Sequence, residues 1–261
     1  MRTPVAAHRD DPLRVYAMTL VTLIAVLALA LPTALPAQQA PLAQARQLIV
    51  VTARGWNDVA GTLQRYERKD VRAPWQAVDA AVPIVVGRNG LAWGLGVNAP
   101  VQRGGPVKHE GDGRAPAGVF TLSNAFGYAP ADSARWLKLP YQRATSTYEC
   151  VDDTTSRFYN QTLERATVSP DWHSSEIMRR SDNAYRWGVI VAHNMPARAA
   201  GGSCIFLHIW SGPTKGTAGC TAMAEPNLLA IMRWLDPARQ PRLVQLTESE
   251  YARVRSAWGL P

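Results

Sequence analysis

Residues 201–223 read GGSCIFLHIWSGPTKGTAGCTAM. The apolar run at 204–210 within this stretch has the length and composition of a buried strand. The loop after it is rich in glycine, proline and small polar residues, which favour turns. We therefore expect a buried strand that carries His208, a turn-rich loop, and a return that places Gly219 and Cys220 ahead of a helix.

Strand signals also dominate the rest of the chain. Apolar or alternating runs predict strands at 47–52, 62–67, 82–86, 91–94, 118–122, 136–139, 187–192 and 242–246. Asn89 and Gly90 give a hairpin signal between two of these runs. Helices are predicted at 226–235, where Pro226 suits the first turn, at 248–258 and at 174–180. The expected fold is mainly β, a sandwich or barrel-like domain with a few peripheral helices.

The N-terminal segment has the pattern of an export signal. Arg2, Arg9 and Arg14 precede an uncharged run at 15–31, and small residues follow as far as Ala37. This order is typical of a secretory signal peptide cleaved after Ala37. A membrane anchor through 15–31 is the alternative, because that run approaches the length of a spanning helix. We expect residues 1–37 to be signal or anchor, 38–46 to be a linker, and the rest to lie in the periplasm or cell envelope.

The charge balance restricts the expected partners. Lys and Arg number 28 against 20 Asp and Glu, for a net charge of +8, and 47% of the residues are hydrophobic. This composition supports a folded core. The basic residues are scattered and form no nucleic-acid motif, so we expect no nucleic-acid partner. An anionic wall polymer or membrane surface fits an exported basic domain, as does an ordinary soluble surface with excess Arg.

His208 and Cys220 are the residues most suited to chemistry. A cysteine attacks as its thiolate, and a nearby histidine can stabilise that thiolate or accept the thiol proton. Gly219 would let a substrate approach the backbone, and backbone N–H groups near Cys220 could stabilise an oxyanion. The following helix would lower the thiol pKa if Cys220 lay at its N-terminus. The alternative is that Cys220 is a packed core residue and His208 a hydrogen-bonded core histidine.

The order His208, spacer, Thr217-Ala218-Gly219-Cys220 resembles the signature of the L,D-transpeptidase (YkuD-type) catalytic domain. That signature has His, a spacer, Ser or Thr, a variable residue that is often His, then Gly and Cys. Residues 111–120, GDGRAPAGVF, resemble the Pro-x-Gly-x-Phe strand of the same family, and 85–87 resemble its earlier strand. The resemblance covers roughly 47–246, with a C-terminal helix at 247–261. A short spacer and Ala218 indicate a divergent branch.

The resemblance implies an exported cysteine acyl-transferase that forms peptidoglycan cross-links or attachments through an acyl-enzyme. Cys220 would be the nucleophile and His208 the general base and acid, with backbone donors from Gly219 and Cys220. Stem peptides of peptidoglycan would be the substrates, and no cofactor is implied. With water as acceptor, the same pair would make an L,D-carboxypeptidase or other amide hydrolase. A non-catalytic cell-wall-binding module, using the basic surface and the nine Trp residues, is the remaining alternative.

Further residues are candidates for substrate binding. Thr217 belongs to the signature. Arg114 could bind a substrate carboxylate or stabilise its own turn. His193 and Asn194 end a predicted strand and could join the site or anchor a loop, whereas Lys108 is expected at the surface.

The cysteine count bears on both the disulfide and the metal question. Cys150, Cys204 and Cys220 are the three cysteines, and an odd count in an oxidising compartment leaves one unpaired. We expect a Cys150–Cys204 disulfide, which leaves Cys220 free. Cys204 and His208 would lie roughly 13 Å apart along a strand, so we expect no metal site.

Overall fold

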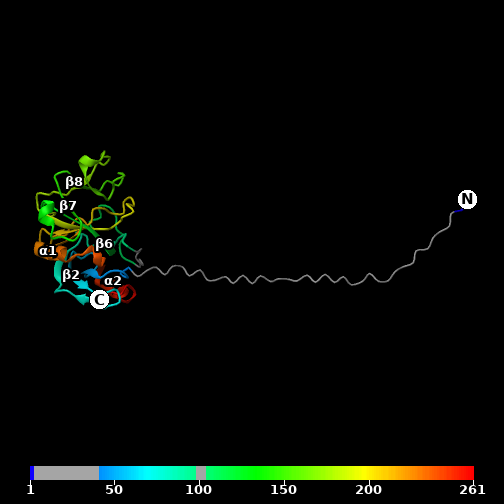
Figure 1. Cartoon of the computed structure of the whole chain (residues 1–261), viewed down its shortest axis with the longest axis horizontal. Coiled ribbons are helices and arrows are strands. Elements are labelled where there is room, and N and C mark those ends of the chain that lie inside the picture. The colour runs from blue at the N-terminus through cyan, green and yellow to red at the C-terminus, as the bar shows by residue number, and fades with distance from the viewer. Residues whose placement is uncertain (3–40, 98–103) are drawn as a thin grey trace. The chain divides into compact units, whose positions relative to one another are not determined.

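The computed structural model describes residues 1–2, 41–97 and 104–261 (Figure 1). The predicted signal or anchor at 1–37, including the run at 15–31, lies outside these ranges apart from its first two residues. Within them, no helix has both the length and the apolar character needed to cross a membrane. Residues 41–46 of the expected linker fold against the domain, where Leu42 and Ala45 are buried in its core.

Eight strands form a closed barrel, which confirms the mainly β prediction and selects the barrel over the sandwich. Their order around the barrel is β1 (Gln47–Ala53), β14 (Arg242–Thr247), β6 (Ala115–Gly127), β11 (Trp187–Val191), β12 (Phe206–Ile209), β13 (Thr221–Met223), β4 (Val82–Val85) and β2 (Ala60–Glu67). The barrel closes because β1 pairs with β14 on one side and with β2 on the other. Closure leaves these strands no free edge.

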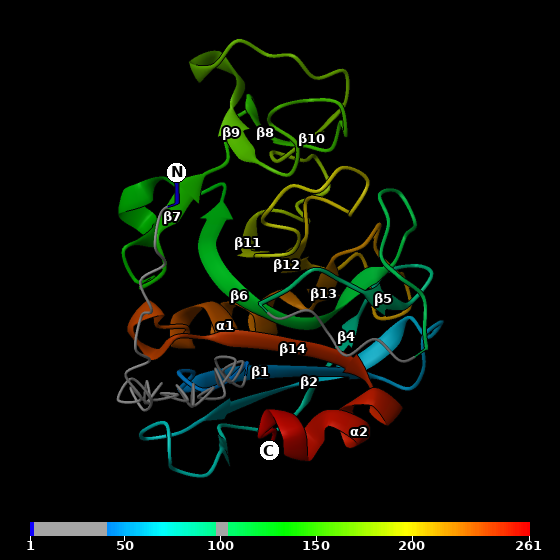
Figure 2. The same cartoon turned by 90° about the vertical axis from the view of Figure 1, so that its right-hand side faces the viewer.

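Three short strands extend the barrel sheet: β3 (Gln76–Ala77), β5 (Leu91–Trp93) and β7 (Tyr141–Arg143). The core comes from inward-facing apolar residues such as Leu48 and Phe120, both fully buried. Figure 2 shows β6 as a long curved strand that crosses the domain, with β14, β1 and β2 side by side below it. The curvature lets a single strand contact both β11 and β14.

Two α-helices lie at the predicted places. α1 (Glu225–Trp234) has Pro226 in its first turn and buries Leu228, Ile231 and Met232. α2 (Glu248–Trp258) is capped by Thr247, whose hydroxyl accepts from the N–H of Glu250, and it ends at Gly259 in the left-handed conformation. Three short 3-10 helices, η1 (Ala131–Ala134), η2 (Arg165–Thr167) and η3 (Pro237–Arg239), complete the helical elements of the described chain.

A separate three-stranded sheet is formed by β8 (Tyr148–Val151), β9 (Thr162–Glu164) and β10 (Ser175–Ile177), with β8 in the middle. Figure 2 shows it at the end of the domain opposite α2. The carboxylate of Glu149 holds it together by accepting from Trp172 at 2.9 Å and from Ser175 at 2.7 Å. We call these three strands the cap sheet.

Two predicted elements are wrong. Residues 174–180 form β10 and a turn instead of a helix, because Glu176 pairs with Cys150 of β8 and Met178 is fully buried. Residues 136–139 form no strand. They follow η1 as a turn, in which Trp136 packs on Trp187 with ring centroids 5.4 Å apart. In both segments, contacts distant in sequence determine the local conformation.

Asn89 and Gly90 form a turn, as predicted, but the strands on either side of them do not form the predicted hairpin. The N–H of Gly90 donates to the carbonyl of Gly87 at 2.7 Å, and Gly90 has a φ of +84°. The flanking strands do not pair with each other. β4 pairs with β2 and β13, whereas β5 runs parallel to β6.

Candidate active site

His208 and Cys220 belong to neighbouring strands of the barrel. β12 and β13 run parallel, with His208 opposite Ala222, and Cys220 directly precedes β13. Both residues line one cavity of about 770 Å³. The loop between them, which sequence reasoning expected to bring them together, forms part of the same wall.

The hydrogen bonding of His208 assigns its tautomer. Nδ1 lies 2.8 Å from the carbonyl oxygen of Ile209. A carbonyl oxygen can only accept, so Nδ1 carries the proton and Nε2 keeps its lone pair. The residue is only 8% exposed, and burial lowers the pKa of the imidazole to about 4. His208 is therefore a neutral base at pH 7. Tyr185 packs edge-on against the imidazole, with the two ring centroids 5.1 Å apart.

The thiol of Cys220 is reduced and 5% exposed. It accepts from the N–H of Phe206 at 3.3 Å and donates to the carbonyl of Cys204 at 3.4 Å. Burial raises the pKa of the thiol above its ordinary value, and the carboxylate of Glu176 adds to the rise. The expected lowering by a helix N-terminus does not occur, because β13 separates Cys220 from the start of α1 at Glu225.

Thr217 shapes the backbone around the thiol. Its hydroxyl donates to the carbonyl of Cys220 at 2.7 Å and accepts from the N–H of Gly219 at 3.1 Å. Its own N–H donates to the carbonyl of Val86, which ties the loop to the end of β4. The N–H of Gly219, expected as an oxyanion donor, is therefore bonded to Thr217 in this structure.

The cavity walls carry charges of both signs. Basic side chains come from Arg88, Lys108, Arg180 and Lys215, and acidic ones from Glu110, Asp152, Glu176 and Asp182. Arg88 and Lys108 lie on loops of the barrel. Glu176 lies in β10 of the cap sheet, and Asp152 directly follows β8 of the same sheet. Such a lining suits a polar ligand that carries both an anionic and a cationic group.

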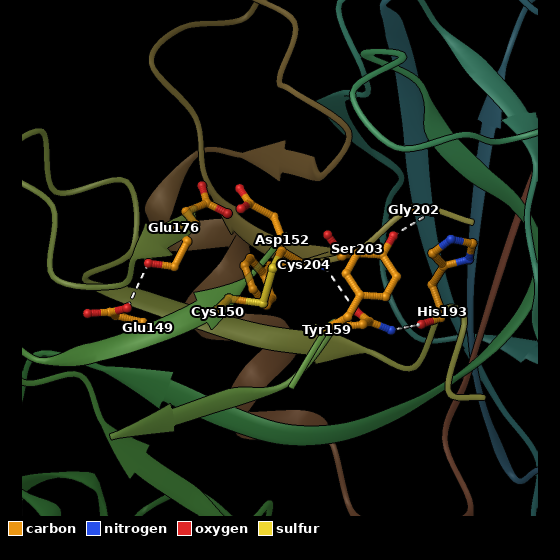
Figure 3. The surroundings of a disulfide bond; sticks show 12 residues. Glu149, Cys150, Asp152, Tyr159, Glu176, His193, Gly202, Ser203 and Cys204 are labelled. Carbon is orange, nitrogen blue, oxygen red and sulfur yellow. Dashed lines mark hydrogen bonds between the residues drawn. A yellow bond between two sulfur atoms is a disulfide. The ribbon is translucent and has the colours of Figure 1, made fainter. Parts of the chain in front are cut away.

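The Cys150–Cys204 disulfide is present, as predicted, and Cys220 is free. Figure 3 shows it beside Asp152 and Glu176. The bond joins β8 of the cap sheet to the residue whose carbonyl accepts from the Cys220 thiol. It therefore fastens the cap sheet to the barrel next to the candidate nucleophile.

Arg114 lies away from the cavity. Its guanidinium donates to the carbonyls of Trp56 at 2.9 Å and Leu91 at 3.0 Å, and to the side chain of Asn57. These bonds hold two loops together. The structure thus places the Arg114 guanidinium in a supporting position, and Arg114 is not among the residues that line the cavity.

His193 and Asn194 are also outside the cavity lining and anchor a loop. The N–H of Leu95 donates to Nδ1 of His193, so Nε2 carries the proton and donates to the carbonyl of Gly201 at 3.0 Å. Burial lowers the pKa of His193 to about 4. Asn194 has a φ of +51° and donates to the carbonyl of Gly202.

Three residues beside the pair were missed from the sequence. Tyr185 bonds through its hydroxyl to Glu176, and both line the cavity. Lys108, expected at the surface, is 5% exposed because its ammonium pairs with Asp112 inside the fold. The sequence signal for the Lys108–Asp112 ion pair was the position of Asp112, four residues after Lys108 and between two glycines.

Comparison with known proteins finds no matching family model, curated protein or solved structure. Over the described ranges, no three or more His, Cys, Asp or Glu side chains gather in a way that could hold a metal ion. The fold and the site therefore define a β-barrel domain with a cysteine–histidine cavity.

Proposed function

We propose that this chain is an exported cysteine acyl-transferase that acts on peptidoglycan stem peptides by L,D-transpeptidation. The observation that carries the proposal is that a reduced cysteine and a neutral histidine, with Nε2 unprotonated, line the same cavity. The resemblance of His208 and residues 217–220 to the transpeptidase signature adds to it. The Cys150–Cys204 disulfide supports a location outside the cytoplasm, because such bonds persist in oxidising compartments.

The first half of the reaction would form a thioester. Nε2 of His208 takes the proton of Cys220 as the sulfur attacks the peptide carbonyl, whose π electrons move onto its oxygen. When the tetrahedral intermediate collapses, the C–N bond to the terminal D-alanine breaks. The leaving amine takes the proton from His208, which leaves an acyl group on Cys220.

The second half would transfer the acyl group. An acceptor amine attacks the thioester carbonyl and gives its proton to His208. The C–S bond then breaks, and the departing sulfur recovers the proton. One peptide bond is broken and one is formed, so no oxidant or other co-reactant is needed. Water in place of the amine would make the same pair a carboxypeptidase.

The pKa values of the two groups fit proton transfer during attack better than a preformed ion pair. At pH 7 the imidazole is neutral because burial lowers its pKa to about 4, and the thiol is protonated because burial raises its pKa. A neutral base and a neutral thiol in the wall of one cavity are the starting state for general-base catalysis once a substrate brings them into line. The thiol proton would leave only as the sulfur attacks the carbonyl of a bound substrate.

The cavity lining also fits a stem peptide. Such a peptide carries free carboxylates together with the amine of a diamino acid, and the cavity presents both basic and acidic side chains. Arg88 and Lys215 could bind carboxylates, and Asp152 could bind an ammonium group. The volume of about 770 Å³ lies in the usual range of ligand pockets and has room for a short peptide segment.

The direct test is D-alanine release from a defined tetrapeptide by the purified domain and by Cys220→Ala. We expect release by the unsubstituted protein and none by the variant, with unchanged circular dichroism. Addition of a second stem peptide should yield a cross-linked product by mass. Equal release by Cys220→Ala would refute the assignment, and release without cross-linking in excess amine would identify a carboxypeptidase.

A non-catalytic wall-binding module is the second candidate, because the Cys220 thiol is buried and its pKa is raised rather than lowered. In that case Cys220 is a core residue. The module would bind isolated peptidoglycan in a salt-dependent way, and no tetrapeptide would be consumed. Binding unchanged by Cys220→Ala, together with no turnover by the parent, would favour this candidate.

A further inference from the structure

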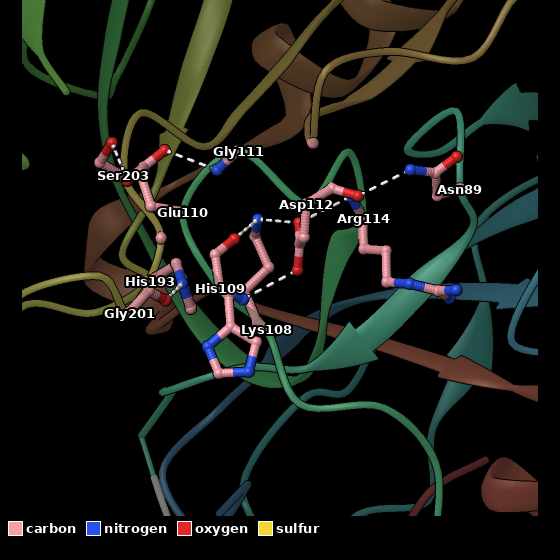
Figure 4. Close-up of polar contacts among 12 residues, drawn as sticks. Asn89, Lys108, His109, Glu110, Gly111, Asp112, Arg114, His193, Gly201 and Ser203 are labelled. Carbon is pink, nitrogen blue, oxygen red and sulfur yellow. Dashed lines mark hydrogen bonds and ion pairs between the residues drawn. The ribbon is translucent and has the colours of Figure 1, made fainter.

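Lys108 places a buried ammonium group in the wall of the cavity. Nζ lies 2.5 Å from the carboxylate of Asp112 and 2.8 Å from the carbonyl of His109. Figure 4 shows the side chain turned toward Asp112. An ammonium group has three N–H donors. Within the described part of the chain, protein atoms occupy two of them, which leaves one donor for a ligand.

The ammonium group lies beside the residue that precedes the nucleophile. A Cβ built on Gly219 would lie 3.8 Å from Nζ of Lys108, with the carbonyl oxygen of Arg114 at 3.2 Å and Cδ1 of Ile205 at 3.5 Å. The charge of Lys108 also acts on the Cys220 thiol and opposes the rise in its pKa. Lys108 thus holds an ammonium group, paired with Asp112, next to the backbone at Gly219 and near enough to Cys220 to act on its thiol.

The attack needs such a charge, because the backbone around Cys220 offers fewer free donors than expected. The N–H of Gly219 is already bonded to the hydroxyl of Thr217 at 3.1 Å. A tetrahedral intermediate places a full negative charge on the former carbonyl oxygen, and buried donors stabilise that charge more strongly than water does. Lys108 lines the same cavity and has one N–H without a protein partner in the described part of the chain, so it can supply the missing hydrogen bond.

We propose that Lys108 is a catalytic residue of this site, whose third N–H donates to the oxygen that becomes negative when Cys220 attacks. The role rests on the proposed function and extends it. No proton needs to leave the ammonium group, because it acts as a hydrogen-bond donor and a charge. In the described part of the chain, the other ionisable side chains that act on the thiol are Glu176 and Tyr185, and neither carries a positive charge.

Asp112 would act as the positioning residue. Its carboxylate accepts from the backbone N–H of His109 at 2.8 Å and from that of Arg114 at 2.9 Å. These bonds fix the carboxylate and thereby fix the ammonium group that it pairs with. Asp112 is not among the cavity-lining residues, so its negative charge stays behind Lys108. Because Asp112 fixes the Lys108 ammonium group before the reaction, little reorganisation would be needed when that group stabilises an oxyanion.

The test compares Lys108→Met with Lys138→Met, which removes a surface charge that pairs with Asp236. We expect Lys108→Met to lower kcat by about 100- to 1,000-fold with little change in KM, the effect of losing one oxyanion donor. Lys138→Met should keep the parent kcat. The rate of iodoacetamide labelling of Cys220 at one fixed alkaline pH, which needs no wall peptide, should fall in Lys108→Met and stay at the parent value in Lys138→Met, because the smaller thiolate fraction reacts more slowly.

The single variant leaves the Asp112 carboxylate buried without its partner, which could unfold the protein. Lys108→Met with Asp112→Asn removes both charges and keeps the fold testable, and we expect it to stay as inactive as Lys108→Met. A double variant with the parent kcat, or a Lys108→Met that raises KM alone, would overturn the catalytic role. No turnover by the parent would overturn the proposed function and this role with it, whereas an active parent with an equally active Lys108→Met would overturn only the role of Lys108.

Discussion

Nδ1 of His208 donates to the carbonyl oxygen of Ile209, the next residue along β12, across 2.8 Å. This bond fixes the plane of the imidazole and directs the unprotonated nitrogen away from the strand backbone. A histidine held this way needs no carboxylate partner to select its tautomer. The base of the candidate site is therefore built from one strand of the barrel, and it is as rigid as that strand.

The pH dependence of turnover should show the low pKa of this base. Because burial lowers the pKa of His208 to about 4, kcat/KM on a tetrapeptide should stay level from pH 8 down to about 5 and fall below it as the imidazole is protonated. His208→Gln should lower kcat by about 100- to 10,000-fold. A decline centred near pH 6.5, the ordinary histidine value, would show that the base is solvent-accessible during turnover.

Thr217 should affect rate more than stability. Thr217→Val removes the hydroxyl that bonds to the Cys220 carbonyl and to the Gly219 N–H. Loss of about 1.4 kcal/mol of positioning corresponds to a roughly tenfold fall in kcat. Thr217→Ser keeps both hydrogen bonds and serves as the matched control, with activity close to that of the parent. Equal kcat values for the Val and Ser variants would show that the turn needs no hydroxyl.

The Cys150–Cys204 disulfide should stabilise the fold. It should also leave Cys220 as the one cysteine that an alkylating reagent can label. Alkylation of the denatured, non-reduced protein should modify Cys220 and spare Cys150 and Cys204. The bond spans a sequence separation of 54 residues, so the double variant Cys150→Ala, Cys204→Ala should lose about 2–4 kcal/mol in the free energy of unfolding. Label on either paired cysteine would argue for a different pairing.

His193 should make the fold sensitive to acid. Its pKa in the folded protein is lowered to about 4, below the ordinary value near 6.5, so only the unfolded chain takes up a proton between these values. The free energy of unfolding should therefore fall as pH drops from about 6.5 to 4, by up to about 3 kcal/mol from this residue. Urea unfolding at several pH values measures the slope.

A matched pair of variants separates His193 from the other titrating groups. His193→Gln should reduce the pH slope by about half, because it removes one of two buried imidazoles whose pKa is lowered to about 4, and His208 contributes the rest. Gln replacing the exposed His173 should leave the slope as it is. A slope that His193→Gln does not change would place the acid sensitivity at other residues.

The elements that follow a local apolar pattern could be predicted from the sequence. β1, β14, α1 and α2 lie where local patterns placed them, because the two strands are continuous apolar runs buried on both faces and the helices carry an apolar face or a capping residue within their own length. β10 could not be predicted, since its conformation depends on pairing with β8 some 26 residues earlier, as in the Glu176–Cys150 pair. Barrel closure through the pairing of β1 with both β14 and β2 is likewise a property of the whole chain.

The residues of the candidate site also divide into those that a local sequence pattern indicates and those whose position depends on distant contacts. His208 and Cys220 could be selected because a strand, a short loop and a recognisable signature join them in sequence. The position of Arg114 could not be foreseen, since the carbonyls that it binds belong to Trp56 and Leu91. Lys108 reaches Gly219 only because the barrel brings residues more than a hundred positions apart together, and no local pattern encodes that approach.

The measurement closest to the central claim is the mass of the protein after brief incubation with a tetrapeptide and an acid quench. We expect a covalent gain equal to the substrate less its terminal D-alanine, mapped to the peptide that contains Cys220 and absent from Cys220→Ala. Consumption of the tetrapeptide by a protein whose Cys220 never becomes acylated, or an acyl group mapped to another residue, would contradict it.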